Sequence, residues 1–389
     1  MEEKLASRMA RLGNETAFDI LVKARALEKK GHEIIHLELG EPDFNTPSSI
    51  VDAGTVALSE GYTHYCAPAG LDELREIIAS HINQSRGVKV DSDWIVVTPG
   101  GKPIMFFLML ALVEKGDEVI YPDPGFPIYE SMIKFVGGTP VPIPLLEDFQ
   151  FSFNPKVLLS KISSRTKLII INSPQNPTGG ILGEKDLATV ASIAIENDIL
   201  VLSDEIYSNV IYEGNHHSIA SVPGMVDRTI ILDGFSKAYS MTGWRLGYGV
   251  MRPELQIQIS KLVTNSVSCT APFIQKAGLE ALRHGSNFIV KMVSEFRERR
   301  NFLVQELNQI PGISCLTPPG AFYVFPNVKS FGKSSNEIED YLLRKAGVAL
   351  LSGTSFGTFG EGYLRISYAN SIQNLAEACR RIRKSLKDL

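Results

Sequence analysis

A lysine and an arginine stand eight residues apart in GFSKAYSMTGWRLGYG, which covers residues 234–249. Lys237 follows a short apolar run and has small or apolar neighbours, whereas most lysines lie on solvated surfaces beside acids. Partial burial and the nearby charge of Arg245 should lower the pKa of Lys237. Such a lysine can act as a nucleophile toward a carbonyl group or as a base. On residue type alone a structural ion pair is more common, so other motifs have to decide.

Several groups in the chain are suited to binding a phosphate. Gly100, Gly101 and Lys102 follow a predicted strand and begin an apolar helix, where backbone N–H groups and the helix dipole attract an anion. Ser236 and Arg245 add a hydroxyl and a guanidinium. A tight turn alone would also explain the paired glycines. The chain has no GxxxxGK[ST] motif, and no convincing phosphate-binding helix follows SGTSFGTFGEG, which argues against an ATP site of the usual kind.

Asp204 ends the apolar run ILVLSD, so its carboxylate should be largely removed from water. A buried carboxylate takes up a proton unless a cation or a donor faces it, and a protonated ring nitrogen is one such partner. A helix cap or a surface turn is the alternative for Asp204 considered alone. A phosphate site, an acid for a ring nitrogen and an activated lysine together fit pyridoxal 5′-phosphate (PLP), which carries a phosphate, a pyridine nitrogen and an aldehyde.

These polar groups follow the ends of predicted strands. From about residue 94, runs rich in Val, Ile and Leu alternate with amphipathic segments such as 184–196. The strand candidates are residues 94–98, 118–121, 139–143, 167–172, 199–203, 229–232 and 246–251. Continuous apolar runs are typical of parallel strands covered on both faces. The pattern predicts a doubly wound α/β sheet, in which active groups gather beyond the carboxyl ends of the strands.

The C-terminal part of the chain has a different pattern. It predicts a smaller α+β unit with helices over 288–309, 336–345 and 371–386 and short strands over 321–325, 348–351 and 364–367. We therefore expect an N-terminal segment, residues 1–46, that joins the small domain. A large cofactor-binding domain is expected over residues 47–286 and a small C-terminal domain over residues 287–389.

The composition is typical of a soluble globular protein, with 44% hydrophobic and 21% charged residues. A net charge of −4 gives no argument for binding nucleic acid or an anionic membrane. The longest apolar run, residues 104–113, is too short to span a bilayer, and the N-terminus lacks a signal pattern. The four cysteines form no CxxC motif and the seven histidines form no metal-binding pattern. We expect a cytoplasmic enzyme without a metal.

Several motifs, in this order and with similar spacing, resemble the class I/II aminotransferases, which are PLP enzymes of fold type I. The resemblance is greatest to the aspartate-aminotransferase-like branch and extends from about residue 17 to the C-terminus. The matching stretches are LELGEPDFNTP, HYCAPAGLDELR, TPGGK, NSPQNPTGG, SDEIYS, GFSKAYSMTGWRLGYG and YLRISYA. The resemblance implies a large domain with a mostly parallel seven-stranded sheet and a smaller α+β domain.

The resemblance also implies catalytic roles. Lys237 would bind the cofactor covalently and then serve as general base, and Asp204 would keep the pyridine nitrogen protonated. Tyr207 and Asn176 would hydrogen-bond the 3-oxygen of the ring. The remaining cofactor contacts would cover the two ring faces, through Phe126 and Ile206, and bind the phosphate, through Gly101, the backbone of Lys102, Ser236 and Arg245.

For the substrate, the resemblance implies that Arg365 binds the α-carboxylate with help from Asn176 and the backbone at Gly40. A guanidinium fork matches a planar carboxylate better than a lysine does. Tyr65 resembles the tyrosine that reaches the phosphate of the neighbouring subunit, which implies a homodimer with active sites at the subunit interface.

The implied activity is ping-pong transfer of an amino group between an L-amino acid and a 2-oxo acid. It would be of the aspartate type or broad, with glutamate and 2-oxoglutarate as one pair. The sequence assigns no cation to a substrate side-chain carboxylate, so alanine and aromatic donors stay open. Another PLP reaction, such as C–S β-elimination, would use the same lysine, aspartate and arginine. A plain nucleotide-binding α/β protein would leave Asp204, Lys237 and Arg365 unexplained.

Overall fold

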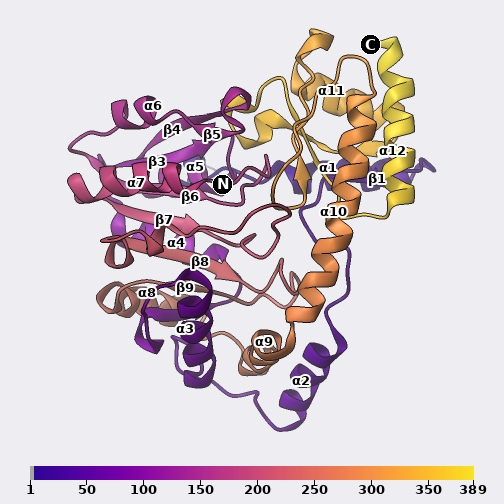
Figure 1. The fold of residues 1–389 in the computed structure, drawn as a ribbon. Coiled ribbons are helices and arrows are strands. Elements are labelled where there is room, and N and C mark those ends of the chain that lie inside the picture. Colours follow the sequence, from indigo (N-terminus) through magenta and orange to yellow (C-terminus); the bar gives the residue numbers. More distant parts are fainter. Residues whose placement is uncertain (1–3) are drawn as a thin grey trace.

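The computed structural model describes residues 4–389, and an eight-stranded sheet forms its centre (Figure 1). The strands lie in the order β2-β9-β8-β7-β6-β3-β4-β5. Their bounds are β2 (Ile95–Thr98), β3 (Glu118–Asp123), β4 (Thr139–Leu146), β5 (Ser152–Phe153), β6 (Thr166–Asn172), β7 (Leu200–Asp204), β8 (Thr229–Gly234) and β9 (Gly247–Val250). β9 runs antiparallel to β2 and β8, and β5 runs antiparallel to β4. The pairs between β8, β7, β6, β3 and β4 are parallel.

Seven of these strands lie where the apolar runs predict them, and the mostly parallel arrangement is confirmed. The predicted number of seven strands is one too low, because β5 adds a short strand at the edge of the sheet. It pairs through Phe153 with Leu145 and through Ser152 with Leu146. Two residues are too few to show a hydrophobic period, so the sequence pattern does not reveal this strand.

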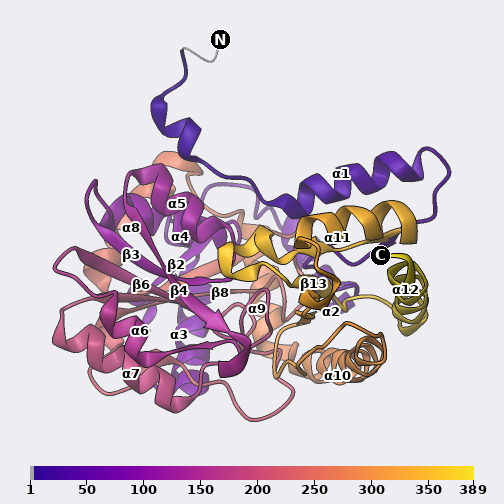
Figure 2. The ribbon, with the colours of Figure 1, turned by 90° about the horizontal axis from the view of Figure 1, so that it is seen from above.

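Helices cover both faces of the sheet (Figure 2). One face packs against α4 (Lys102–Leu112), α5 (Ile128–Val136) and α8 (Pro253–Ser266). The other face packs against α3 (Asp72–Arg86), α6 (Pro155–Ser160), α7 (Glu184–Glu196) and α9 (Pro272–His284), and α9 also contacts α2 (Ser48–Ser59). Leu168 and Ile170 of β6 face the first layer, whereas Ile169 and Ile171 face the second. Burial on both sides explains the continuous apolar run.

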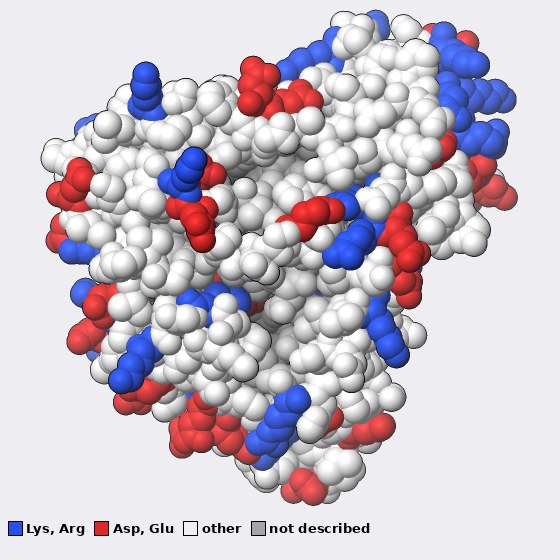
Figure 3. Space-filling model, in the orientation of Figure 1, with Lys and Arg blue, Asp and Glu red and all other residues white. Residues whose placement is uncertain are grey.

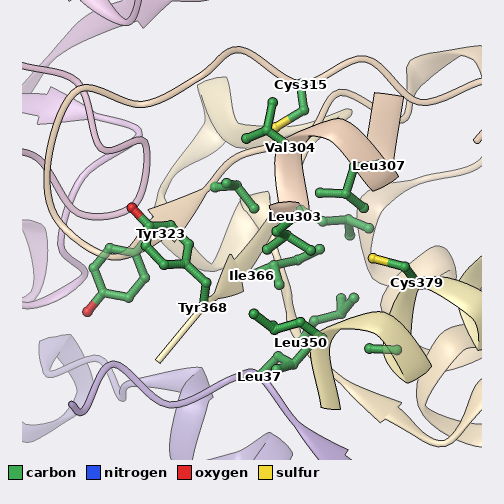
Figure 4. Packing of buried hydrophobic residues seen from close by; sticks show 14 of the residues in the cluster. Leu37, Leu303, Val304, Leu307, Cys315, Tyr323, Leu350, Ile366, Tyr368 and Cys379 are labelled. Carbon is green, nitrogen blue, oxygen red and sulfur yellow. The ribbon is translucent and has the colours of Figure 1, made fainter. Parts of the chain in front are cut away.

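The C-terminal unit packs beside the sheet, at the right of Figure 1. It contains α10 (Ser286–Asn308), β10 (Tyr323–Val324), α11 (Ser335–Tyr341), β11 (Val348–Ala349), β12 (Leu351–Ser352), β13 (Leu364–Ser367) and α12 (Ile372–Ser385). β13 is the central strand of a three-stranded antiparallel sheet with β10 and β12. Figure 4 shows the core of this unit, with Tyr323 beside Tyr368 on the side away from Cys379.

The N-terminal segment packs against the C-terminal unit. α1 (Thr16–Glu28) buries Ile20 and Ala24 in a cluster that includes Leu351, and β1 (Ile35–His36) pairs in parallel with β11. The chain then runs through residues 37–47 to α2. The division into a segment of residues 1–46 and domains of residues 47–286 and 287–389 stays a prediction.

A buried ionic cluster lies behind the carboxyl ends of β7 and β8. Arg86, in the last turn of α3, donates from Nε to Glu205 Oε2 at 2.6 Å and from Nη2 to Asp233 Oδ2 at 3.0 Å. His216 Nε2 lies 2.9 Å from Glu205 Oε2. Burial opposes the ionisation of Glu205, but His216 and Arg86 outweigh it and lower its pKa. Burial raises the pKa of Asp233 to about 6, and Arg86 opposes that shift.

Arg86→Met should therefore lower the free energy of unfolding strongly, because it leaves Glu205 and Asp233 buried without their guanidinium. Removing one partner of a buried ion pair costs about 3–5 kcal/mol. Urea denaturation followed by far-ultraviolet circular dichroism measures the effect. Arg344→Met is the matched control, because Arg344 pairs with Asp340 on an exposed helix face. A loss for Arg86→Met as small as that of the control would contradict this account.

Candidate active site

A cavity of about 570 Å³ lies where the carboxyl ends of β7 and β8 face the C-terminal unit. Asp204, Ser236 and Lys237 line it from the sheet, and Tyr323 and Arg365 line it from the C-terminal unit. The surface in the orientation of Figure 1 is hollowed near its centre, and acidic and basic side chains are mixed over it (Figure 3). The cavity thus lies where ligands bind in open α/β sheets.

Lys237 is partly buried in the cavity wall, three residues beyond the end of β8. Its Nζ donates to the backbone oxygen of Gly40 at 2.5 Å. Burial lowers the pKa of Lys237 to about 8; Glu41 opposes the shift, and the charges of Arg365 and other cations add to it. The neutral amine is therefore accessible near neutral pH, as the sequence predicts.

Asp204 is 5% exposed and accepts two hydrogen bonds from neutral donors. Tyr129 Oη donates to Oδ2 at 2.7 Å, and the backbone N–H of Ile206 donates to Oδ1 at 3.3 Å. Burial raises the pKa of Asp204 to about 6, and the bond from Tyr129 opposes this shift. A cationic ring nitrogen in the cavity would stabilise the carboxylate form further.

The loop before α4 forms a cradle suited to an anion. Gly100 has φ +87°, and a Cβ there would lie 2.1 Å from Arg245 Nη2. A Cβ on Gly247 would lie 2.5 Å from the backbone nitrogen of Gly101. These glycines let the guanidinium and two backbone segments approach one another at the start of α4. Ser236 also lines the cavity, so the residues predicted to bind the phosphate meet at a helix N-terminus.

The side chain of Lys102 has a partner that the sequence does not indicate. Its ammonium forms an ion pair with Glu15, which precedes α1, and both residues line the cavity. The ammonium also lies 5.3 Å from the centre of the Phe126 ring. The predicted phosphate site uses only the backbone of Lys102, so its side chain is left for another role.

Arg365 is 3% exposed and lies on β13. Its Nη1 donates to Asn176 Oδ1 at 3.2 Å, and its Nη2 donates to the backbone oxygen of Glu38. Its Nε has no hydrogen-bond partner among residues 4–389. The guanidinium carbon lies 4.6 Å from the ring centre of Tyr323 and 4.9 Å from that of Phe356. A buried guanidinium with a free donor can bind a carboxylate.

Asn176 and Tyr207 enter the cavity from neighbouring loops. Asn172 at the end of β6 positions Asn176, because its Oδ1 accepts from Asn176 N at 2.9 Å while its Nδ2 donates to Asp204 O at 3.0 Å. The hydroxyl of Tyr207 lies 2.6 Å from that of Tyr323. Burial raises the pKa of Tyr207 well above its usual value, so this phenol stays protonated.

Sequence reasoning missed several residues that line this cavity, among them Tyr129, Tyr323 and Glu15. Tyr129 lies one helical turn beyond Phe126, and Tyr323 lies in the run GAFYVF, but nothing distinguishes either from a core aromatic residue. Tyr323 nevertheless restricts the site, because a Cβ on Gly40 would lie 2.2 Å from its hydroxyl. Glu15 has no signal in the sequence at all.

The cavity brings together most of the predicted site residues. Those that line it are Gly40, Gly101, Lys102, Phe126, Asn176, Asp204, Ile206, Tyr207, Ser236, Lys237, Arg245 and Arg365. Tyr65 is the exception: it is 85% exposed and does not line the cavity of its own chain. Its contact with a partner subunit stays a prediction, as do the individual roles of the other residues.

Comparison with known proteins identifies the family. The family model for aminotransferases of class I and II matches residues 32–382. The chain belongs to this family. It is 42% identical over 360 residues to an aspartate aminotransferase of Pyrococcus horikoshii, with 92% of each chain covered. It is 39% identical over 396 residues to a probable aspartate/prephenate aminotransferase of Aquifex aeolicus, with 100% of each covered. The structure of the Thermus thermophilus aspartate aminotransferase with maleate matches it with a TM-score of 0.94 and 34% identity, over 98% of this chain and 99% of that chain.

The protein is therefore a PLP-dependent aminotransferase of fold type I, which confirms the resemblance and the cofactor predicted from sequence. The cavity fits the cofactor, because it offers a glycine cradle for the phosphate, a buried carboxylate and a lysine with a lowered pKa. Within residues 4–389, no helix is long and apolar enough to cross a membrane, and no cluster of acidic, histidine or cysteine side chains suits a metal.

Tyr129→Phe should move the acid limb of the pH–rate profile to higher pH. The change removes a donor that lowers the pKa of Asp204, so the carboxylate takes up its proton at a higher pH. Under the role predicted for Asp204, activity is then lost earlier as the pH falls. A hydrogen bond to a charged group is worth about 1.5–3 kcal/mol, so the shift should be roughly one pH unit or more. The profile of kcat/KM between about pH 5 and 9 measures it.

Tyr121→Phe is the matched control, since Tyr121 is buried on β3 next to the same helices but does not line the cavity. An acid limb at the same pH in Tyr129→Phe and wild type would contradict the role of Tyr129.

Proposed function

We propose that this aminotransferase accepts an acidic L-amino acid, with aspartate-type or broad specificity, and uses glutamate and 2-oxoglutarate as one substrate pair. The observation that carries the proposal is the ammonium of Lys102 in the cavity. The two relatives described above, an aspartate aminotransferase and a probable aspartate/prephenate aminotransferase, point the same way.

The cations that line the cavity differ in what they can bind. Under the proposed roles, Lys237 holds the cofactor, Arg245 holds its phosphate and Arg365 holds the substrate α-carboxylate. The ammonium of Lys102 is then the cation left for a second carboxylate. In this structure Glu15 neutralises it. A substrate carboxylate has the same charge and shape as that of Glu15, so an acidic side chain can take its place at Lys102 without a change in net charge.

The proposed roles of the protein groups follow from their contacts. Arg365 and Asn176 bind and orient the α-carboxylate. Asp204, which accepts a hydrogen bond from Tyr129, keeps the pyridine nitrogen charged. Lys237 carries the proton from Cα to the cofactor carbon, and its pKa of about 8 suits a base near neutral pH. When bound, PLP supplies an electron-withdrawing ring that accepts the electrons of the Cα–H bond.

Phe126 and Ile206 line the same cavity, which supports their proposed positions against the two faces of the cofactor ring. Tyr207 and Asn176 are proposed to bind the 3-oxygen. The phosphate would be bound by Gly101, the backbone of Lys102, Ser236 and Arg245.

We also propose a two-fold homodimer in the cytoplasm. Tyr65 is 85% exposed, and the nearby helix α2 exposes Val51, Val56 and Leu58, which supports a partner surface at this end of the molecule. The cysteines Cys66, Cys269, Cys315 and Cys379 are all free thiols, which supports a reducing compartment.

Borohydride reduction of the holoenzyme tests the assignment of Lys237. We expect peptide mass mapping to find the reduced cofactor attached to Lys237. Lys237→Ala should not form this adduct. Its turnover should fall by at least about a thousandfold, because general-base catalysis alone contributes about 10²–10⁴-fold. Wild-type turnover in Lys237→Ala, or an adduct on another lysine, would contradict the assignment.

Lys102→Met should raise KM for aspartate by at least about tenfold while KM for alanine stays nearly unchanged, since a charge-assisted hydrogen bond is worth about 1.5–3 kcal/mol. Glu15→Gln should lower KM for aspartate, because it frees the ammonium. Spectral titration of the bound cofactor with each amino acid, and its recovery with 2-oxoglutarate, measures donor choice.

Lys134→Met is the matched control, because it breaks a surface pair with Glu130. If Lys102→Met changes KM for aspartate and for alanine equally, Lys102 does not select the acidic side chain. A donor panel in which aspartate and glutamate give no spectral change would overturn the proposed substrate class.

A further inference from the structure

The glycine-rich stretch SGTSFGTFGEG, residues 352–362, is not accounted for by the site described above. It forms two 3₁₀ turns, η9 (Gly353–Phe356) and η10 (Thr358–Gly360), between β12 and β13. Its ends are drawn together, because Gly353 N donates to Tyr363 O at 2.8 Å. The stretch thus forms a compact loop next to the strand that carries Arg365. We call residues 353–360 the β12–β13 loop.

Asp123, the last residue of β3, holds this loop from across the interface with the sheet. It is 2% exposed. Its Oδ2 accepts from Thr358 N at 3.1 Å and from Thr358 Oγ1 at 3.0 Å, and its Oδ1 accepts from Phe359 N at 3.0 Å. Gly357 has φ +129°, and a Cβ there would lie 2.0 Å from Asp123 Oδ1. Only glycine permits so close an approach, so the loop is shaped around this carboxylate.

Another hydrogen bond between the sheet side and this loop lies beside those of Asp123. Gly125 N donates to Phe356 O at 2.7 Å, and Phe126 is the next residue in the chain. The β12–β13 loop is therefore bonded to the segment that carries Phe126, the residue proposed to stack on the cofactor.

The loop also forms part of the pocket around Arg365. The ring of Phe356 is 4% exposed and lies 4.9 Å from the guanidinium carbon of Arg365, with Tyr323 also against the guanidinium at 4.6 Å. Tyr323 is held by its bond to Tyr207, whereas Phe356 is part of the loop and packs in the hydrophobic cluster that α1 joins. A guanidinium binds a carboxylate through two donors only while its plane is fixed, so the Phe356 side of the pocket affects that fit.

We propose that Asp123 is a positioning residue for substrate binding: by holding the β12–β13 loop, it fixes Phe356 against Arg365 and ties the carboxylate pocket to the Phe126 segment. Asp123 does not line the cavity. The inference rests on the proposed role of Arg365 in binding the α-carboxylate. It makes the affinity for every substrate that carries this carboxylate depend on a residue outside the site.

Steady-state kinetics of the holoenzyme with Asp123→Ala and Asp123→Asn test the inference. We expect KM for the amino acid and for the oxo acid to rise about tenfold in Asp123→Ala, with kcat within about twofold of wild type, since a positioning defect weakens binding of the carboxylate in ground and transition states alike. Asp123→Asn keeps one acceptor oxygen, so its KM values should lie between those of wild type and Asp123→Ala. The dissociation constant of maleate, an unreactive dicarboxylate, measured through the spectrum of the bound cofactor, should rise in parallel with KM.

Two further variants keep the test decisive. Gly357→Ala places a Cβ against Asp123 and should reproduce the rise in KM, even if Asp123→Ala folds poorly. Asp91→Ala is the matched control, because Asp91 caps another 3₁₀ turn, η3 (Ser92–Trp94), away from the cavity. Unchanged KM and maleate affinity in Asp123→Ala, with only a lower midpoint of thermal unfolding, would overturn the inference and leave Asp123 a purely structural residue.

Arg365→Lys separates this inference from the proposed function. If Arg365→Lys weakens maleate binding but Asp123→Ala does not, the inference fails and the role of Arg365 stands. If Arg365→Lys leaves maleate affinity unchanged, the proposed role of Arg365 fails and the inference fails with it.

Discussion

The charges buried at the carboxyl ends of β7 and β8 constrain the rest of this structure. Successive side chains of a strand point to opposite faces of the sheet, so Asp204 faces the cavity while the next residue, Glu205, faces the layer behind it. Behind the sheet, Arg86 donates hydrogen bonds to both Glu205 and Asp233, and His216 contacts Glu205. In front, Asp204 has only neutral donors. The carboxylates behind the sheet thus have a cationic partner within the protein, whereas Asp204 in front is open to a cationic ligand.

Other polar groups of the cavity are likewise held by protein neighbours but remain able to bind a ligand. Arg365 bonds to Asn176 and to the backbone of Glu38 but keeps Nε unpaired. Lys237 has a backbone oxygen as its hydrogen-bond partner, and burial keeps its pKa near 8. Fixing such groups before the ligand arrives reduces the reorganisation needed when it binds. The buried aromatic rings of Tyr207 and Tyr323 supply the rigid wall that makes this possible.

The sequence was sufficient to predict the seven longer strands, the family and many of the groups that line the cavity, because each rests on a local pattern. Apolar runs mark strands buried on both faces, and polar clusters at their ends mark a site. It was not sufficient for Tyr129, Arg86 or Asp123. Each acts on residues far along the chain: Tyr129 lies 75 positions from Asp204, and Asp123 lies 235 from Thr358. Such residues have no period or motif, and only the folded chain brings them to their partners.

The contrast between Lys102 and Arg365 shows why substrate choice is harder to predict than chemistry. The α-carboxylate is common to all amino acid substrates, and Arg365, the arginine proposed to bind it, is buried on β13. Lys102 and Glu15, the pair proposed to meet the substrate side chain, come from a helix start and from the N-terminal segment. A pair formed by two separate segments can change without disturbing the sheet. Under the proposed roles, the chemistry follows from the strand ends, whereas specificity depends on contacts between segments that neither segment reveals by itself.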